Sequence, residues 1–337
     1  MKHIQKTIRL FLAVASFAAL MFGSSVFAQD HVVWRLGHTL TVPGSLYEKI
    51  ITEEIPERIS QASDGMIRVQ PLIGVVGTND ILNALQTGRV QMGSLTVAYS
   101  AATHPLWAVL NLPGLVTNKE QIGPIARAIV QPKIAKDMEK WGINPAVVVS
   151  WDGGAYFSNR RIEKVEDFSG PQWRTHAPML SQLIEELGGS TIGMPFEELY
   201  PSLERGLVDA YTTTVPAMHA ARLDEVTKYV IEAPQGTSLA VVMVSDAALN
   251  SLPDDVRKNV VAELKAINNE VGPRLYQEYI DLLQGIREEG GMELIKFSDE
   301  EAAKVTEIAK KTVWSKWLEA TGERGEQLIQ KIQSATE

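Results

Sequence analysis

The amino-acid sequence predicts an α/β protein of two domains that are joined by more than one chain crossing. Three observations lead to this prediction. The chain has 337 residues, of which 45% are hydrophobic, and this is enough for two cores. Strand-like and helix-like segments alternate along much of the sequence. A helical pattern over residues 253–289 would run about 55 Å at about 1.5 Å per residue, longer than one domain of this size.

The first domain is expected to be a layer of mostly parallel strands covered by helices. Strands are predicted from short apolar, β-branched runs, and helices from apolar residues three and four positions apart. The predicted strands are 32–36, 66–70 and 90–96, and the predicted helices are 45–63, 81–87 and 119–140. Ligands of such sheets bind beyond the carboxyl ends of the strands. This rule places His38, Thr39 and the loop 96–100 near any cleft.

A second α/β unit is predicted after a strand at 146–151. Its expected elements are a helix at 178–187, a strand at 190–193, a helix at 197–206 and a strand end or loop at 208–214. The strand 239–244 is assigned back to the first domain, so the chain crosses near Trp151 and again near Leu239. Two crossings form a hinge, and a hinge permits closure around a ligand. The expected domains are 29–151 with 239–279, and 152–238 with 280–337.

The long helix at 253–289 is expected to span both domains. Its apolar residues recur at steps of three and four from Val256 to Ile286. Gly272 and Pro273 are expected to kink it. The alternative is two ordinary helices joined at Gly272. A short strand at 293–297 and a last amphipathic helix at 299–321 complete the predicted fold.

The first 28 residues have the parts of a secretory signal peptide. Lys2, Lys6 and Arg9 make a positive start, residues 10–22 are apolar, and permissive residues precede a cleavage site after Ala28. The alternative is a membrane anchor, but the apolar run is shorter than the about 20 residues that span a bilayer. Export to the periplasm is therefore expected.

Composition and charge exclude several classes of protein. The chain contains no cysteine, which excludes a disulfide scaffold and a thiolate metal site. The formal net charge is −9, and it becomes −12 when the leader is removed with its three cations and no acidic residue. A protein this acidic is a poor partner for nucleic acid. An anionic ligand must therefore be bound by locally placed donors.

Arg174 is the candidate anchor for such a ligand. It lies on a predicted short strand between two apolar segments. The planar guanidinium group donates two parallel hydrogen bonds to a carboxylate and stays charged at all relevant pH values. The alternative is a structural ion pair with a nearby Asp or Glu.

An ordered set of motifs extends around Arg174. Ser-Asn-Arg-Arg-Ile occupies 158–162, Glu-Asp-Phe-Ser-Gly occupies 166–170, Pro-Phe-Glu-Glu-Leu-Tyr occupies 195–200, and Gly-Leu-Val-Asp occupies 206–209. With these motifs, nearly all of the mature chain resembles the extracytoplasmic solute receptors of tripartite ATP-independent periplasmic (TRAP) transporters, in the dicarboxylate-receptor-like (DctP) branch.

The resemblance implies a two-domain periplasmic binding protein of the α/β class, with hinge crossings and a long domain-spanning helix. It implies that Arg174 pairs with the ligand carboxylate and that Phe196 lines the pocket. Thr213 stands where the family often has Asn, which changes the polar contact there. Many sugar-acid receptors carry a second arginine just before the Ser-Asn pair, where this chain has Gly-Gly-Ala-Tyr at 153–156. This departure favours an apolar or aromatic monocarboxylate.

Further candidates for the pocket are aromatic and polar residues near the predicted cleft. Trp151 and Tyr156 are predicted to line it, although such aromatics are more often part of a core. Trp173 is expected to face away from Arg174, because strand side chains alternate. His38 and Thr39 are predicted ligand contacts, the alternative for His38 being a buried group with its own partners.

No metal, cofactor or catalytic motif is expected. The histidines of the mature chain lack the spacing of a helical metal site, and the sequence has neither a Gly-x-Ser-x-Gly elbow nor a Walker loop. The favoured hypothesis is a monomeric receptor that captures an organic acid and delivers it to a membrane permease. Two alternatives remain: a ligand-capturing partner of a periplasmic sensor domain, and a secreted hydrolase or lyase.

Overall fold

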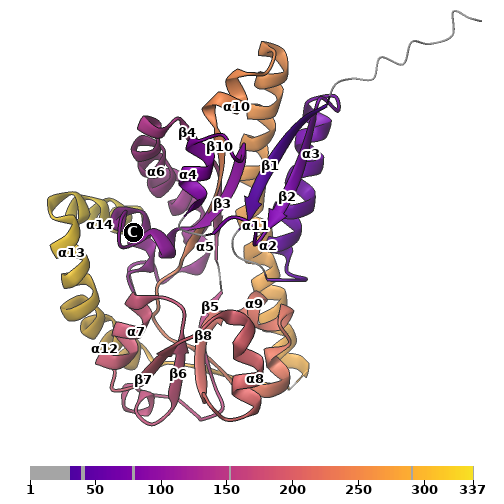
Figure 1. Ribbon diagram of the computed structural model, residues 1–337. Helices are drawn as coiled ribbons and strands as arrows, with labels where there is room; N and C mark the ends of the chain where they lie inside the picture. The colour runs from indigo at the N-terminus through magenta and orange to yellow at the C-terminus, as the bar shows by residue number, and fades with distance from the viewer. Residues whose placement is uncertain (1–30, 39–41, 78–79, 152, 290, 337) are drawn as a thin grey trace, which may run out of the picture.

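The computed structural model describes residues 31–38, 42–77, 80–151, 153–289 and 291–336. Two β-sheets form the centres of two lobes, which lie one above the other in Figure 1. The predicted signal peptide with its cleavage site after Ala28, and the candidate contact Thr39, lie outside the described residues.

The first sheet has the strand order β2-β1-β3-β10-β4. Its strands are β1 (Val32–His38), β2 (Ile67–Ile73), β3 (Met92–Thr96), β4 (Ile143–Ser150) and β10 (Leu239–Ser245). β1 pairs parallel with β2 and β3, whereas β10 is antiparallel to both β3 and β4. β10 starts at the second chain crossing and so runs away from the cleft, opposite to its neighbours. Four of the five strands therefore run in the same direction, in line with the predicted mostly parallel layer, and β10 alone makes the sheet mixed.

The second sheet has the order β11-β9-β5-β8-β6-β7. Its strands are β5 (Gly154–Ser158), β6 (Gln172–Thr175), β7 (Ser190–Gly193), β8 (Ala210–Thr214), β9 (Tyr229–Glu232) and β11 (Glu293–Lys296). β5 is antiparallel to β8 and β9, and the other pairs are parallel. β5 and β9 were not predicted, because four or five residues give little periodic signal.

Helices of the first lobe follow the predicted ranges closely, except for α10, which was not predicted. They are α2 (Leu46–Lys49), α3 (Ile55–Ala62), α4 (Ile81–Gln86), α5 (Lys119–Ile125), α6 (Gln131–Met138) and α10 (Asp246–Asn250). π-helical segments connect α2 to α3 and α5 to α6, so the helical stretches predicted at 45–63 and 119–140 are each continuous. Ser45 caps α2, because its hydroxyl accepts from the backbone N–H of Glu48.

The second lobe carries α7 (Pro178–Glu186), α8 (Leu199–Glu204) and α9 (Val215–Ala220). Near the end of the chain follow α12 (Asp299–Ala309), α13 (Ser315–Thr321) and α14 (Glu323–Thr336). The sequence did not predict α9 or α14. The indoles of Trp314 and Trp317 donate to the carbonyls of Pro113 and Pro105, so the chain end contacts the first lobe. The proposed division of the chain at residue 280 stays a prediction.

Helix α11 (Asp254–Glu289) is one helix of 36 residues that passes through Gly272 and Pro273. Val260 and Leu264 belong to the core beneath the first sheet, whereas Tyr279 and Leu283 belong to the core of the second lobe. The predicted domain-spanning helix is therefore confirmed, and the alternative of two separate helices is wrong.

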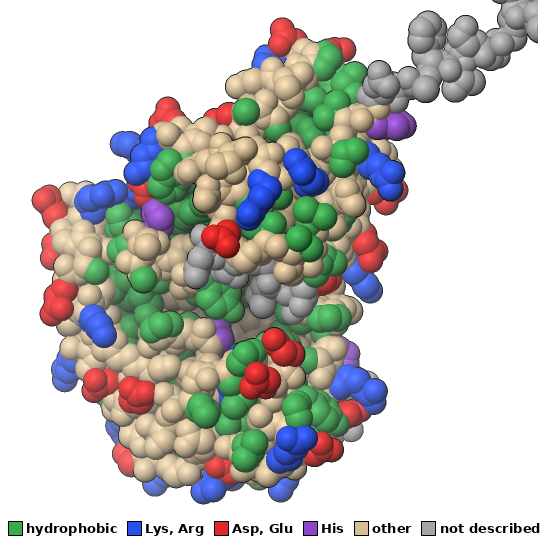
Figure 2. All heavy atoms as spheres, viewed as in Figure 1, with side chains coloured by type: hydrophobic (Ala, Val, Ile, Leu, Met, Phe, Trp, Pro, Cys, Tyr) green, Lys and Arg blue, Asp and Glu red, His purple; other side chains and the backbone are tan. Residues whose placement is uncertain are grey.

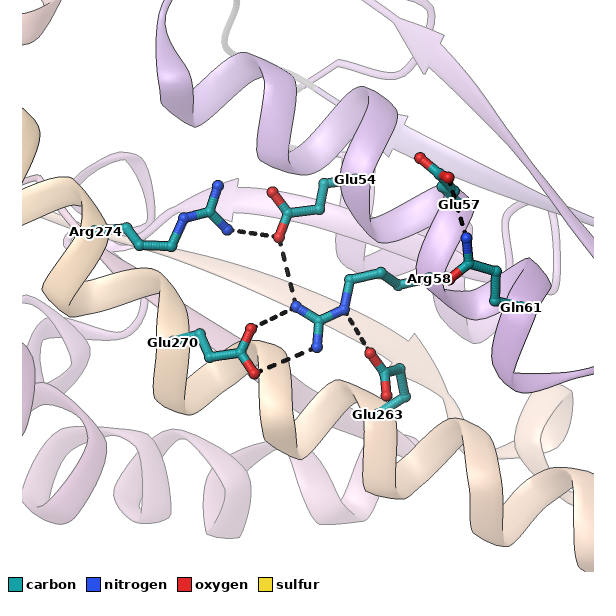
Figure 3. Close-up of polar contacts among 7 residues, drawn as sticks. All are labelled: Glu54, Glu57, Arg58, Gln61, Glu263, Glu270 and Arg274. Carbon is teal, nitrogen blue, oxygen red and sulfur yellow. Dashed lines mark hydrogen bonds and ion pairs between the residues drawn. The ribbon is translucent and has the colours of Figure 1, made fainter.

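Ion pairs hold α3 against α11 in the first lobe (Figure 3). Arg58 donates to Glu263 at 2.5 Å and to Glu270 at 2.6 Å, and it contacts Glu54 at 3.5 Å. Glu54 also accepts from Arg274 at 2.6 Å. This network fixes the helix that spans the lobes to the helix that covers the first sheet.

Three segments cross between the lobes: 151–153, 233–238 and α11. Lys119 bonds to the strand residues next to the first two crossings and to α11 itself. Its ammonium group donates to the carbonyl of Gly154 at 3.2 Å, to the carboxylate of Glu232 at 3.3 Å and to the hydroxyl of Tyr279 at 3.0 Å. The cation at the start of α5 thus links β5, β9 and α11 at the ends of the crossings.

Candidate ligand-binding site

A groove of about 1650 Å³ lies between the two lobes. Figure 2 shows the molecule hollowed at this level. The groove leads to an inner cavity of about 90 Å³. Five residues line both spaces: Tyr99, Asn111, Arg174, His176 and Phe196. Both lobes therefore contribute to the walls.

Arg174 is buried at this junction, with 3% of its surface exposed. It is the third residue of β6. Its Nε and Nη2 donate to the carbonyl of Met194 at 3.1 and 2.9 Å, and its Nη1 reaches the carbonyl of Thr212 at 3.4 Å. Among the residues that the structure describes, no carboxylate lies within the 4.0 Å of an ion pair. The carbonyls fix the orientation of the guanidinium group and leave its charge without a counterion there.

The walls beside Arg174 are largely apolar and aromatic. The ring centroid of Phe196 lies 5.7 Å from the guanidinium carbon, within the range of a cation–π contact. Trp151 and Thr213 line the same inner cavity. Four of the predicted ligand contacts, Arg174, Phe196, Trp151 and Thr213, are thus brought to one small space by β6, β8 and the first crossing.

Tyr156 is placed elsewhere by the structure. It is fully buried, its ring packs edge-on against Phe168 and Trp173, and its hydroxyl donates to the carbonyl of Pro234. Trp173 precedes Arg174 on β6 and faces the opposite side of the sheet, as predicted. Tyr156 packs with Trp173 and is therefore on the side away from Arg174.

His38 also lies outside both spaces. Its Nδ1 is 2.6 Å from the hydroxyl of Ser94, and its Nε2 is 3.6 Å from the carboxylate of Glu48. Burial lowers the pKa of His38, and Glu48 partly opposes this shift. Of the two alternatives weighed for His38, the described geometry matches the buried group with partners of its own.

His176 influences the charge of the site. Its Nδ1 lies 3.4 Å from the hydroxyl of Thr212. Burial, together with the charge of Arg174, lowers the pKa of His176 to about 4. The imidazole is therefore neutral at pH 7, and the positive charge of the inner cavity resides on Arg174.

Several lining residues were not predicted individually. Thr96 ends β3, and Tyr99 lies in the loop 96–100 that strand-end reasoning placed near the cleft. Asn111, Gln235 and Ser238 lie in a 3₁₀ segment and in the second crossing, where no periodic pattern marks a site. Within the described ranges, no group of three or more His, Asp or Glu side chains could hold a metal ion.

Residues 36–320 match the family model DctP, described as bacterial extracellular solute-binding protein, family 7. The chain belongs to this family. A solute-binding protein of Albidiferax ferrireducens is 23% identical over 311 residues, which cover 88% of this chain and 90% of the relative. The DctP family consists of transport receptors rather than enzymes. The resemblance to TRAP solute receptors is confirmed, and with it the periplasmic location typical of the family.

Solved structures share the fold. DctP6, a Bordetella pertussis extracytoplasmic solute receptor binding pyroglutamic acid, superposes with a TM-score of 0.81 at 19% identity, covering 90% of this chain and 100% of that one. A TRAP periplasmic solute-binding protein of Shewanella oneidensis with bound succinate superposes with a TM-score of 0.78 at 19% identity. The match covers 91% of this chain and 100% of that one. The predicted two-domain α/β architecture of the DctP family is thereby confirmed. In the part of the chain that the structure describes, no helix combines the length and apolarity needed to span a bilayer.

Proposed function

We propose that the protein is the periplasmic receptor of a TRAP transporter for a small monocarboxylate whose body is apolar or aromatic. The observation that carries the proposal is Arg174, a guanidinium group that is buried between the lobes and has only carbonyl partners among the described residues. A buried charge is costly unless it is paired. A ligand carboxylate would supply the missing countercharge in a bidentate arrangement.

The lining of the inner cavity supports one carboxylate rather than two. Arg174 is the single Lys or Arg among the described residues that line it. A second carboxylate would be desolvated there without a cation. Tyr99, Trp151 and Phe196 supply flat surfaces against which an apolar ring or chain can pack.

The similar structures support the broader class of ligand, a small organic acid. The Bordetella pertussis receptor binds pyroglutamic acid and the Shewanella oneidensis receptor holds succinate, both small organic acids. In this proposal the ligand contacts both lobes, shifts the population toward a closed form, and is handed to the permease subunits. The receptor acts as a monomer after cleavage of its leader behind Ala28. Family membership favours a permease over a sensor domain as the partner.

The test is a thermal-shift screen of small organic acids on the wild type and on Arg174→Ala. Acids that raise the melting temperature of the wild type should have no effect on the variant, because removing one member of a desolvated charge pair costs about 2–5 kcal/mol of binding. Arg160→Ala is the matched control, since Arg160 is exposed and pairs with Asp209 away from the cavity. Undiminished shifts in Arg174→Ala would contradict the proposal.

A further inference from the structure

The inner cavity has polar atoms that Arg174 does not explain. Five side-chain atoms in its wall are buried and have no hydrogen-bond partner: Thr96 Oγ1, Asn111 Oδ1, Trp151 Nε1, Gln235 Nε2 and Ser238 Oγ. Buried polar groups in folded proteins are nearly always paired, and an indole N–H in particular finds an acceptor. Five such atoms around one small space indicate a partner that enters from outside.

These five residues come from a different part of the fold than the carboxylate anchor. Thr96 ends β3, and Asn111 ends a 3₁₀ segment of the first lobe. Trp151, Gln235 and Ser238 lie on the two crossings next to the first sheet. Arg174, Phe196 and Thr213 belong to the second lobe. One wall of the cavity is therefore cationic, and the other is neutral and polar.

The neutral wall offers both donors and acceptors. The indole N–H of Trp151 can only donate, the amide nitrogen of Gln235 donates, and the amide oxygen of Asn111 accepts. The hydroxyls of Thr96 and Ser238 can do either. The complementary ligand group has an acceptor beside a donor, as an amide or a lactam does.

Charged groups do not suit this wall. Arg174 is the single cation, and no Asp or Glu occurs among the described residues that line the inner cavity. An ammonium group would find no counterion there, and a second carboxylate would find none beyond Arg174. The neutral wall thus excludes amino acids with a free amine as well as dicarboxylates.

We propose that Thr96, Asn111, Trp151, Gln235 and Ser238 form a second binding wall, which selects monocarboxylates carrying a neutral amide or lactam group. This inference rests on the Arg174 carboxylate anchor of the proposed function, and it changes the rest of the proposed ligand from a purely apolar body to one that carries a neutral amide or lactam group. The second lobe binds the carboxylate of the ligand. The first lobe and the crossings form hydrogen bonds with its neutral amide or lactam group. A ligand that lacks the neutral group fills the cavity and leaves the polar atoms of this wall unpaired.

The test compares two matched pairs of acids by calorimetry. Pyroglutamate is compared with cyclopentanecarboxylate, and succinamate with 4-methylpentanoate, so that each pair differs in the amide and little in shape. The amide-bearing member of a pair should bind about 10- to 100-fold more tightly, because a site built for hydrogen bonds rejects the analogue that lacks them. Equal or tighter binding of the apolar members would overturn the inference, as would binding of none of the four.

Substitutions in the neutral wall test whether its side chains cause the preference for amide-bearing acids. Gln235→Met removes the amide and keeps the length of the side chain, and it should weaken the amide-bearing acid about 10-fold while changing its apolar counterpart about 2-fold or less. Trp151→Phe removes the indole N–H and serves as a second, independent variant. Gln61→Met, at an exposed glutamine of α3, is the control. Equal weakening of both members of a pair would show a merely structural role.

The outcomes also separate this inference from the proposed function. If apolar carboxylates bind well and need Arg174, the proposed function stands and only the neutral wall fails. If no organic acid of the wider screen depends on Arg174, the proposed function fails as well.

Discussion

Arg174 shows how one strand residue sets the chemistry of the cleft. Its side chain points to one face of β6, while Trp173 occupies the opposite face in the core of the second lobe. The carbonyls of Met194 and Thr212 hold the guanidinium group without neutralising it. Alternation along a four-residue strand thus separates the ligand anchor from the hydrophobic core.

His176 makes the stability of the unliganded protein depend on pH. Its pKa in the folded protein is about 4, below the value of 6.5 in an unfolded chain. Between about pH 6.5 and 4 the unfolded chain binds a proton that the folded protein does not, so the free energy of unfolding falls as the pH falls. The loss across this window is expected to be about 3 kcal/mol.

Urea unfolding of wild type and His176→Gln at a series of pH values measures this contribution. The variant should lose less stability than the wild type between pH 6.5 and 4. His219→Gln changes an exposed histidine and should retain the wild-type profile. Parallel profiles for wild type and His176→Gln would contradict the assignment.

The site could be predicted from the sequence where a motif or a strand end marks the residue. Arg174 and Phe196 lie in motifs, and Trp151 directly follows a clear strand. Tyr156 shows the limit: it was predicted to line the cleft, but it lies on the face away from Arg174, because it belongs to β5, a strand that the sequence did not predict. Asn111 and Gln235 come together through tertiary packing of irregular segments, which local patterns do not encode.

At the scale of elements, the first crossing depends on a close approach between backbone and α11. Gly153 has φ +76°, and a Cβ atom there would lie 2.2 Å from the ring of Tyr279. Gly65 has a similar φ of +78°, but it has open space around the Cβ position. Alanine variants at the two glycines therefore distinguish the cost of backbone strain, which both share, from the cost of steric overlap, which only Gly153 has.

Gly65→Ala should cost about 1–2 kcal/mol through its left-handed backbone alone. Gly153→Ala should cost about 1–3 kcal/mol more, because the methyl group forces Tyr279 and α11 away from the crossing. Chemical denaturation of both variants checks the difference. Equal losses would show that the crossing tolerates displacement of α11.

Long periodic elements were predictable, whereas short ones were predicted only in part: β7 and β11 were predicted, but β5, β9 and α9 were not. The 3–4 spacing from Val256 to Ile286 predicted α11 and its two-lobe span, because every turn presents an apolar residue to a core. β5, β9 and α9 have at most six residues, so tertiary pairing decides their structure. α14 follows a break at Gly322, whose φ is +56°, and the last predicted helix ends just before this residue.

At the scale of the whole molecule, the two lobes divide the recognition of one ligand. The second lobe offers the cation, and the first lobe and the crossings offer neutral polar groups. Lys119 links β5, β9 and α11 where they meet the hinge, so a movement of one of them acts on the others. A ligand that contacts both walls binds the closed form more tightly than the open form. This difference in affinity is what shifts the population toward the closed form.

A crystal structure of the protein with an acid selected by the thermal-shift screen tests the central claim most directly. We expect both carboxylate oxygens of the ligand about 2.7–2.9 Å from nitrogens of Arg174, inside the cavity between the lobes. A ligand bound elsewhere, or a carboxylate held by other groups while Arg174 keeps only its carbonyl partners, would contradict the account.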